Sequence, residues 1–172
     1  EMRPVGETEF VNGVAAMSAS GVYGSTRVCE GIVGHADLTL GDRVEDVLEQ
    51  HIRVGGGRFR GIRHITAWDA DASLLNPAYS PPKGILADRT FRRGFAVLGS
   101  LGLTFDAWLY HPQIDELTAL AQAFPETRIV LDHVGGPLAI GPYQGRREEL
   151  FPTWARSIKG LAACPNVFLK VG

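Results

Sequence analysis

The chain has 172 residues, of which 45% are hydrophobic and 21% are charged, a composition typical of a globular protein with an apolar core. Its formal net charge is −2 with acidic and basic residues interspersed, so neither nucleic acid nor a membrane surface is an expected partner. No apolar run approaches the roughly 20 residues that span a bilayer, and the first residues lack a signal-peptide pattern. Cys29 and Cys164 lie far apart without CxxC spacing, so we expect reduced thiols in a cytoplasmic protein.

Helical and strand patterns alternate along the sequence. In chain order we predict a helix end at 9–18, a strand at 27–35, a helix at 42–54, a strand at 59–65, a helix at 88–102, a strand at 104–111, a helix at 113–124, a strand at 128–133, a helix at 148–163 and a strand at 166–172. Most of these strands are short apolar runs, as expected where both faces of a parallel sheet are covered. The alternation predicts βαβ units with right-handed crossovers.

The helix predicted at 42–54 has recognisable ends and a recognisable buried face. Asp42 is its expected N-cap, and Gly55 follows its last residue. Four apolar residues recur at the spacing of one helix face and are predicted to be buried: Val44, Val47, Leu48 and Ile52.

The pattern as a whole predicts a single α/β domain over residues 1–172, of the (β/α)8 barrel type. A complete barrel takes about 250 residues, and this sequence holds only five predicted strands, so the chain would form a partial barrel. An open, doubly wound sheet of five strands is the alternative. We favour the partial barrel because no residue after Gly172 covers the last strand, and exposed strand edges would favour association into homo-oligomers.

Four of the five histidines, His35, His64, His111 and His133, end predicted strands. In a β/α barrel the carboxyl ends of the strands converge on the active site. Imidazole is the commonest metal ligand and is suited to proton transfer near neutral pH. A structural role is the alternative for each histidine, but four in equivalent positions favour a site. His35 is assigned to substrate binding on its position alone. His51 lies late in a helix and is expected to face solvent or to cap the end of that helix.

Arg63 and His64 are neighbours on one predicted strand. Their side chains should therefore point to opposite faces, so at most one of them enters the mouth of a barrel. An arginine there would bind a carboxylate or a lactone oxygen, and a salt bridge to the adjacent strand is the alternative.

Other polar residues adjoin the strand-end histidines. Tyr110 and Gln113 flank His111 within one turn and are candidates for orienting a substrate. Strand alternation predicts that Asp132 points away from His133, as a cap or hydrogen-bond acceptor rather than a member of the site.

Motifs of several other site types are absent from the sequence. There is no GxGxxG or GxxxxGK[ST] motif, so dinucleotide and P-loop sites have no support. The absence of GxSxG argues against a serine hydrolase. The connections at 66–87 and 134–147 are long, and such loops after a strand are more often functional than incidental.

Four segments resemble the amidohydrolase-related (amidohydrolase 2) family: GIVGHAD at 31–37, RFRGIRH at 58–64, IVLDHVGGP at 129–137 and VFLKVG at 167–172. This family consists of TIM-barrel, metal-dependent hydrolases and includes fuconolactonase and pyrone-dicarboxylate lactonase. The resemblance covers essentially the whole chain. It implies that the five predicted strands correspond to strands three to seven of the eight.

The resemblance also implies roles for individual residues. His133 matches the sixth-strand histidine of the metal-type site, and His111 lies on the preceding strand, where the wider superfamily often places another ligand. Both are therefore candidate catalytic and metal-ligating residues, with His64 as a third catalytic candidate and Arg63 as a substrate contact. The family's first-strand His-x-His and eighth-strand aspartate have no counterpart here. The implied divalent metal, zinc or similar, thus lacks part of its ligand set, and some lactonases of this type work without a metal.

The implied activity is hydrolysis of a lactone or amide bond in a small-molecule substrate. Water would attack the carbonyl with a strand-eight carboxylate as base, while histidines, arginine or a metal stabilise the oxyanion. A decarboxylase on the same barrel is the nearest alternative, because relatives of the family perform that reaction. A catalytically incomplete fragment, or a non-catalytic binding or assembly module, is a further alternative.

Overall fold

A computed structural model describes residues 1–171. The strands are β1 (Ile32–Gly34), β2 (Phe59–Ile65), β3 (Thr104–Trp108), β4 (Ile129–Leu131) and β5 (Val167–Leu169). The α-helices are α1 (Val5–Ala19), α2 (Val44–Val54), α3 (Arg89–Ser100), α4 (Ile114–Ala123) and α5 (Arg147–Leu161). All five predicted strands and all five predicted helices are confirmed. The bounds of β2 are those predicted, whereas the other strands are shorter because their ends leave the sheet as turns and loops.

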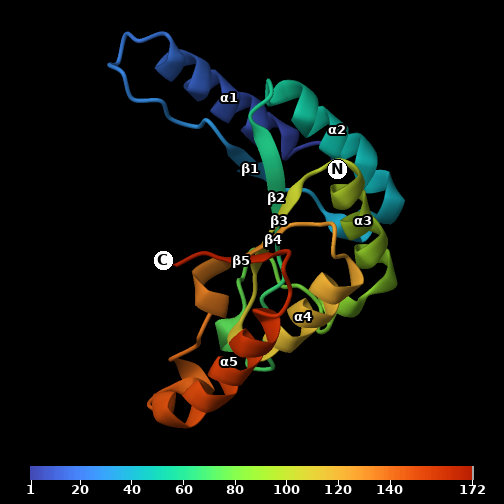
Figure 1. The fold of residues 1–172 in the computed structure, drawn as a ribbon, viewed down its shortest axis with the longest axis vertical. Coiled ribbons are helices and arrows are strands. Elements are labelled where there is room, and N and C mark those ends of the chain that lie inside the picture. Colours follow the sequence, from blue (N-terminus) through green and yellow to red (C-terminus); the bar gives the residue numbers. More distant parts are fainter. Residues whose placement is uncertain (172) are drawn as a thin grey trace.

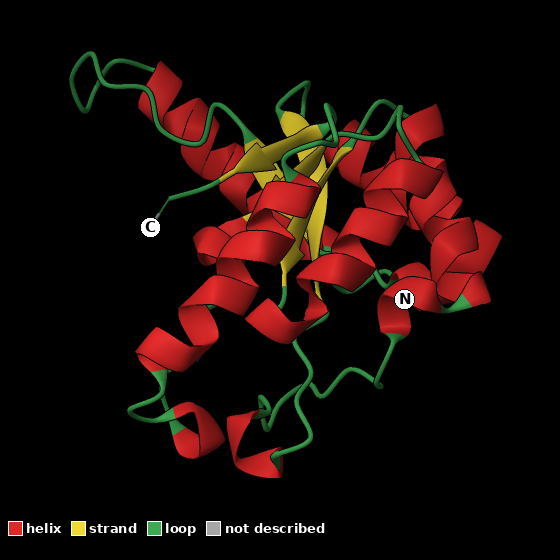
Figure 2. Cartoon of the chain, turned by 60° about the horizontal axis from the view of Figure 1, so that its bottom comes forward, coloured by secondary structure: helices red, strands yellow, loops and turns green. Residues whose placement is uncertain are grey.

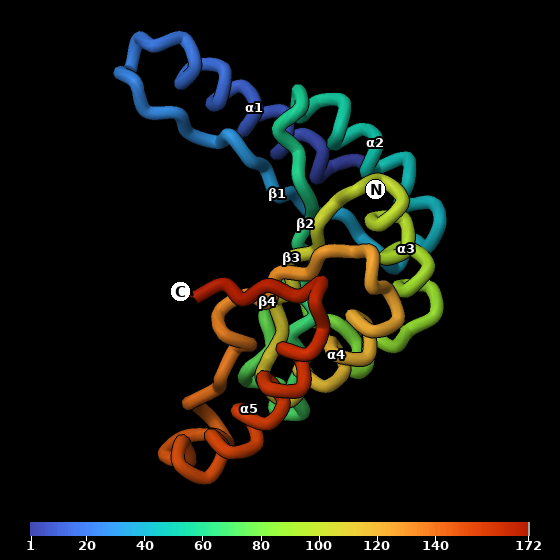
Figure 3. The backbone as a smooth tube through the Cα atoms, viewed as in Figure 1, coloured from blue at the N-terminus to red at the C-terminus, as the bar shows by residue number. Residues whose placement is uncertain are grey.

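The five strands form one parallel sheet in the order β1-β2-β3-β4-β5. Each crossover therefore steps in the same direction, and right-handed crossovers of this kind place their helices on one face of the sheet. Figure 1 shows α2, α3 and α4 along the same side of the strands, with α1 and α5 at the two ends of this layer. The tube in Figure 3 follows the same progression from the N-terminus to the C-terminus.

This winding distinguishes the two predicted architectures. A doubly wound sheet reverses its strand order and carries helices on both faces, whereas sequential order with one helical layer is the pattern of a β/α barrel. Figure 2 shows the strands packed against this helical layer. The predicted partial barrel is thus confirmed.

The apolar core lies between the sheet and the helices. Phe95 of α3 packs edge-on against Phe105 of β3, with ring centroids 5.2 Å apart, and both side chains are fully buried. Val44, Val47 and Leu48 of α2 are buried as predicted, but Ile52 is 38% exposed. The residue before it, His51, takes the fourth buried position on that face.

Two further expectations about α2 are wrong. His51 is fully buried rather than facing solvent, because its ring nitrogens are bonded to neighbouring elements on the inner side of the helix. Asp42 does not cap the helix, because the chain already turns in a 3₁₀ segment, Leu38–Arg43, whose N-cap is Asp37. Asp42 instead forms an exposed ion pair with Arg93 at 3.7 Å.

Cys29 and Cys164 are both free thiols. None of the helices in the described part of the chain, residues 1–171, combines the length and the apolar character needed to cross a membrane.

Close packing of α3 on the segment before α2 depends on Gly94. A Cβ atom at this position would lie 2.3 Å from the carbonyl oxygen of Leu38. We expect Gly94→Ala to lower the free energy of unfolding by about 1–3 kcal/mol through overpacking, measured by chemical denaturation. Gly13→Ala in α1 is the matched control, because a Cβ there meets no atom within 4 Å. It should gain up to about 1 kcal/mol from helix propensity. Stabilisation by both substitutions would contradict the close approach of α3.

Candidate functional site

The face of the sheet opposite the helices, called the open face below, carries charged side chains. Arg63 pairs in register with Asp106, Asp106 with Val130, and Val130 with Phe168, so these four residues form one row across β2 to β5. Phe168 is 53% exposed, so no helix of the described chain covers the β5 end of this row.

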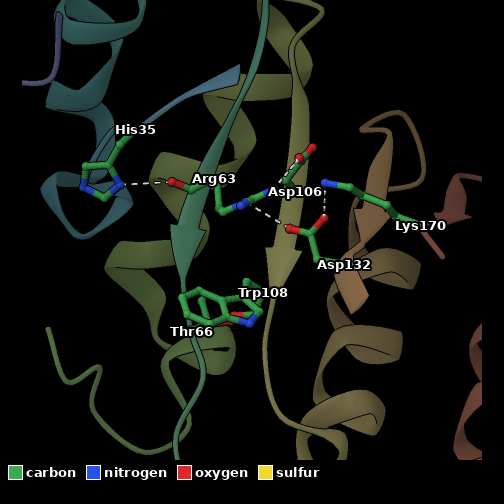
Figure 4. Close-up of polar contacts among 7 residues, drawn as sticks. All are labelled: His35, Arg63, Thr66, Asp106, Trp108, Asp132 and Lys170. Carbon is green, nitrogen blue, oxygen red and sulfur yellow. Dashed lines mark hydrogen bonds and ion pairs between the residues drawn. The ribbon is translucent and has the colours of Figure 1, made fainter. Parts of the chain in front are cut away.

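An ionic cluster of Arg63, Asp106, Asp132 and Lys170 occupies the open face near the carboxyl ends of the strands (Figure 4). Arg63 Nε lies 3.0 Å from Asp132 Oδ2, and its Nη2 lies 3.4 Å from Asp106 Oδ2. Lys170 Nζ lies 3.3 Å from Asp132 Oδ1. In Figure 4, Arg63 reaches across β3 to Asp132, and Lys170 approaches that carboxylate from the other side. Arg63 Nη2 donates a hydrogen bond to Asp106 Oδ2, whereas the contacts of Asp132 are electrostatic rather than well-aligned hydrogen bonds.

The cluster is nearly balanced in charge but unevenly buried. The Asp132 side chain is fully buried, whereas those of Arg63 and Lys170 remain 36% and 47% exposed. Burial raises the pKa of Asp106, and repulsion from Asp132 raises it further, while Arg63 opposes the shift. The two cations thus have accessible surface beside two poorly solvated carboxylates, an arrangement suited to contacting a polar or anionic substrate group.

The backbone is strained immediately after β4. His133 and Val134 both have left-handed dihedral angles, with φ values of 50° and 55°. This conformation is costly for a non-glycine residue and above all for a β-branched one, and such strain gathers at functional sites. Hydrogen bonds hold it: Val134 N donates to Lys170 O, and Trp154 Nε1 donates to Val134 O.

Alternation from Val130 places Asp132 on the open face, and the left-handed turn brings His133 to the same side, so Asp132 does not point away from the site as expected. Asp132 faces the ionic cluster, and the His133 ring lies edge-on to Trp108 with centroids 6.4 Å apart. Trp108 pairs in register with Ile65 and therefore faces the same side as Arg63 and Asp106. Both Asp132 and His133 consequently lie on the open side of the sheet.

His64 points to the other face, among the helices. Its Nδ1 accepts a hydrogen bond from Leu38 N, so its Nε2 carries the ring proton and lies 2.6 Å from the hydroxyl of Tyr79. Burial lowers the pKa of His64 to about 4, which keeps the ring neutral near pH 7. The structure brings His64 together with Phe91 and the 66–87 connection, not with the ionic cluster.

His111 lies at a separate, mainly apolar cavity of about 460 Å³. The cavity lies between the connection after β4 and the first turns of α5, and His133 is not among its lining residues. His111 Nδ1 accepts a hydrogen bond from Leu138 N, and burial lowers the pKa of its ring. The neutral ring therefore carries its proton on Nε2 as a hydrogen-bond donor. Beside it, Tyr143 donates to Asp69 at 2.7 Å, and burial with this bond raises the pKa of Tyr143 to about 12.

Tyr110 and Gln113 hold the long connection after β2. The Tyr110 hydroxyl donates to Leu74 O, and Gln113 bonds Thr66 O and Trp68 N through its two amide atoms. Gln113 is buried, and the polar groups of both residues form hydrogen bonds with the loop rather than pointing to the open face.

His35 lies beside β2. Its Nδ1 donates to the carbonyl oxygen of Arg63 at 3.0 Å, so the neutral ring carries its lone pair on Nε2. His35 and Arg63 both line a second cavity of about 350 Å³, with Val33 and Ile65 of the open face.

Residues 1–171 do not form a metal site on their own. No group of three histidine, cysteine, aspartate or glutamate side chains within residues 1–171 is arranged to hold an ion. A metal-bound histidine normally donates the N–H of its other ring nitrogen. At His111 that nitrogen accepts instead, and a metal on Nε2 would leave the ring without a proton. The arrangement at His111 therefore does not fit a metal ligand.

Asp106 and Lys170 were missed in the sequence, although a usable signal was present. Each is a single charged residue inside an otherwise apolar strand pattern, FDAW and VFLKV. A charge at such a position is costly unless it is paired, so the pattern by itself indicates partners on neighbouring strands.

A singly wound parallel sheet with charged residues gathered at the carboxyl ends of its strands is the architecture of a β/α-barrel enzyme. The sequence profile of the family described as Amidohydrolase matches residues 24–172. The chain belongs to the amidohydrolase family.

Individual relatives agree with this assignment. An uncharacterized protein of Sinorhizobium fredii, y4mH, is 33% identical over 168 residues, which make up 98% of this chain and 50% of that protein. The L-fucono-1,5-lactonase of Burkholderia ambifaria is 27% identical over 150 residues, covering 87% of this chain and 44% of that enzyme. The chain thus spans about half the length of the curated relatives it matches.

Solved structures show the same relationship. An amidohydrolase from Burkholderia multivorans, crystallised with bound zinc, superposes with a TM-score of 0.69 at 25% identity, over 96% of this chain and 49% of that one. A second crystal structure of an amidohydrolase from that organism, with bound HEPES, gives a TM-score of 0.63 at 25% identity over 83% of this chain and 44% of that one.

The ionic cluster predicts how Asp106 titrates. We expect Asp132→Asn to lower the pKa of Asp106, because it removes a repelling carboxylate and leaves Arg63 to pair with Asp106 alone. Carboxyl ¹³C NMR titration measures this pKa. Asp42→Asn, an exposed change on the helical layer, is the control and should leave it unchanged. An unaltered Asp106 pKa in Asp132→Asn would show that the two carboxylates are not coupled.

Proposed function

We propose that this chain forms strands three to seven of a longer barrel enzyme that hydrolyses a small-molecule lactone. Membership of the amidohydrolase family and the similarity to an L-fucono-1,5-lactonase support this function. The half-length match to the relatives supports a longer enzyme.

The single observation that carries the proposal is the left-handed turn at His133 beside the ionic cluster. Strain of about 1–3 kcal/mol per residue persists only where the surrounding structure enforces it. Here the strained turn places His133 on the same open side of the sheet as Asp132, whose carboxylate is paired with Arg63. Barrel enzymes hold their substrates at this end of the strands.

In the proposed reaction, water attacks the lactone carbonyl, and the bond from the carbonyl carbon to the ring oxygen breaks to give a hydroxy acid. Arg63 contacts the carbonyl or ring oxygen, because its guanidinium is fixed by Asp132 and Asp106 yet partly exposed. A fixed cation stabilises the developing oxyanion without reorganisation. His133 contacts the reacting group, and the base that activates the water lies in another part of the enzyme.

The zinc bound in the Burkholderia multivorans amidohydrolase raises the question of a metal in this enzyme. Because the residues of this chain do not assemble a ligand set within 1–171, no step of the proposal passes through a metal. His111 is instead proposed as a neutral N–H donor to a substrate oxygen at its cavity.

The role of His133 is testable in the full-length protein. We expect His133→Ala to abolish hydrolysis of lactones while leaving the thermal unfolding midpoint close to that of the wild type, because the ring is not part of the apolar core. The assay follows acid release from sugar lactones and aromatic-derived lactones. Arg53→Ala on the exposed side of α2 is the control and should retain activity. Full activity in His133→Ala would refute the assignment, and release of carbon dioxide from a carboxylated substrate would favour the decarboxylase.

The role of His111 has a separate readout. We expect the full-length wild type and His111→Ala to retain equal amounts of zinc after incubation with the metal and gel filtration, because the ring nitrogen that should donate is occupied as an acceptor. Elemental analysis of the protein fractions measures the zinc. A lower zinc content in the variant would establish His111 as a ligand.

A further inference from the structure

A chain of hydrogen bonds links α1 to the backbone carbonyl of His35, and a separate hydrogen bond links the His35 ring to β2. Thr8 Oγ1 of α1 lies 2.8 Å from His51 Nδ1 of α2, and His51 Nε2 lies 3.0 Å from the carbonyl oxygen of His35. The His35 ring in turn lies 3.0 Å from the carbonyl oxygen of Arg63, through Nδ1 (Figure 4).

The partners determine where each proton lies. A carbonyl oxygen only accepts, so His51 Nε2 and His35 Nδ1 must both carry hydrogen. Burial lowers the pKa of His51, so its ring is neutral near pH 7 and Nδ1 must accept from the Thr8 hydroxyl. In the neutral His35 ring, the remaining nitrogen, Nε2, carries a lone pair.

The packing around this chain of bonds is close. Thr8 and His51 are fully buried, and the His51 ring stacks on Phe59 with an interplanar angle of 7°. Gly34 provides the space, because a Cβ atom there would lie 3.1 Å from Thr8 Oγ1 and 3.3 Å from His51 Cε1. The backbone carbonyl of His35, the next residue, is therefore held by His51, whose ring is fixed by Thr8.

We propose that Thr8 and His51 are positioning residues for His35, which accepts a hydrogen bond through Nε2 from a hydroxyl group of the substrate. His35 lines the second cavity with Glu7, Val33, Arg63 and Ile65, so a substrate in this cavity would adjoin both His35 and Arg63. A cavity lined by a histidine acceptor and an arginine suits a substrate that presents both a hydroxyl group and a carbonyl, such as a hydroxylated lactone.

The lactone in this inference rests on the proposed function, but the positioning of His35 does not. Thr8 lies before the segment that matches the family profile, residues 24–172, so family membership alone assigns it no role. The experiment therefore separates the state of the His35 ring from the identity of the substrate.

The first measurement is ¹⁵N NMR of the histidine rings in the full-length protein. We expect His35 Nε2 to have the shift of an unprotonated nitrogen in the wild type and in Thr8→Ser, which keeps the hydroxyl. Thr8→Val removes the donor to His51 at nearly constant volume. It should loosen the hold of His51 on the His35 backbone, weaken the bond from His35 Nδ1 to Arg63 O and so decrease the population of this His35 form. Thr8→Ala removes the same hydroxyl with more space if Thr8→Val does not fold. A protonated Nε2 in the neutral wild-type ring, or no change in either hydroxyl-deleting variant, overturns the proposal.

The second measurement compares a sugar lactone with its analogues that each lack one hydroxyl group. We expect Thr8→Val to lower kcat/KM for the parent lactone about tenfold, and to have much less effect on the analogue that lacks the recognised hydroxyl. Thr8→Ser should behave as the wild type with both. An equal loss on every lactone would show a purely structural role and overturn the substrate contact. If no lactone is hydrolysed, the proposed function fails, while the NMR result still decides the positioning of His35.

Discussion

One fully buried carboxylate, that of Asp132, organises the open face of the sheet. A carboxylate out of contact with water is costly unless cations compensate its charge, and here Arg63 and Lys170 do so from opposite sides. These cations come from β2 and from the end of β5, so the contact spans the sheet across β3 and β4. It forms only when the strands lie in their sequential, parallel order, and it fixes the direction of the Arg63 side chain on which the proposed substrate contact depends.

The left-handed turn after β4 is the second feature on which the open face depends. It places Asp132 and His133 on one side of the sheet, which alternation along a strand does not allow. It also directs Val134 toward the cavity of His111, where Trp154 binds its carbonyl group. A single irregular segment thus adjoins both the ionic cluster and the apolar cavity.

The four strand-end histidines have different surroundings despite their equivalent positions in the sequence. His64 is neutral, buried and directed to the helices, and His111 presents an N–H group at a separate cavity. His35 donates through Nδ1 to the Arg63 carbonyl, which leaves the lone pair of the neutral ring on Nε2. Donor and acceptor partners on neighbouring backbone groups decide these states, so a histidine at a strand end can be an acceptor, a donor or a structural residue.

The sequence by itself determined the class of fold and the family. Apolar runs, helix periodicity and breaker residues are local signals, and they located all five strands and all five helices, with β2 to the residue. The sequence could not decide which side of each strand end faces the site. Asp132 was expected to point away, and Asp106 and Lys170 were passed over, because their partners lie on other strands and are set by register. Only the tertiary structure decided the conformation of His133, the burial of His51 and the direction of each imidazole, since these depend on hydrogen bonds and ion pairs between residues far apart in the chain.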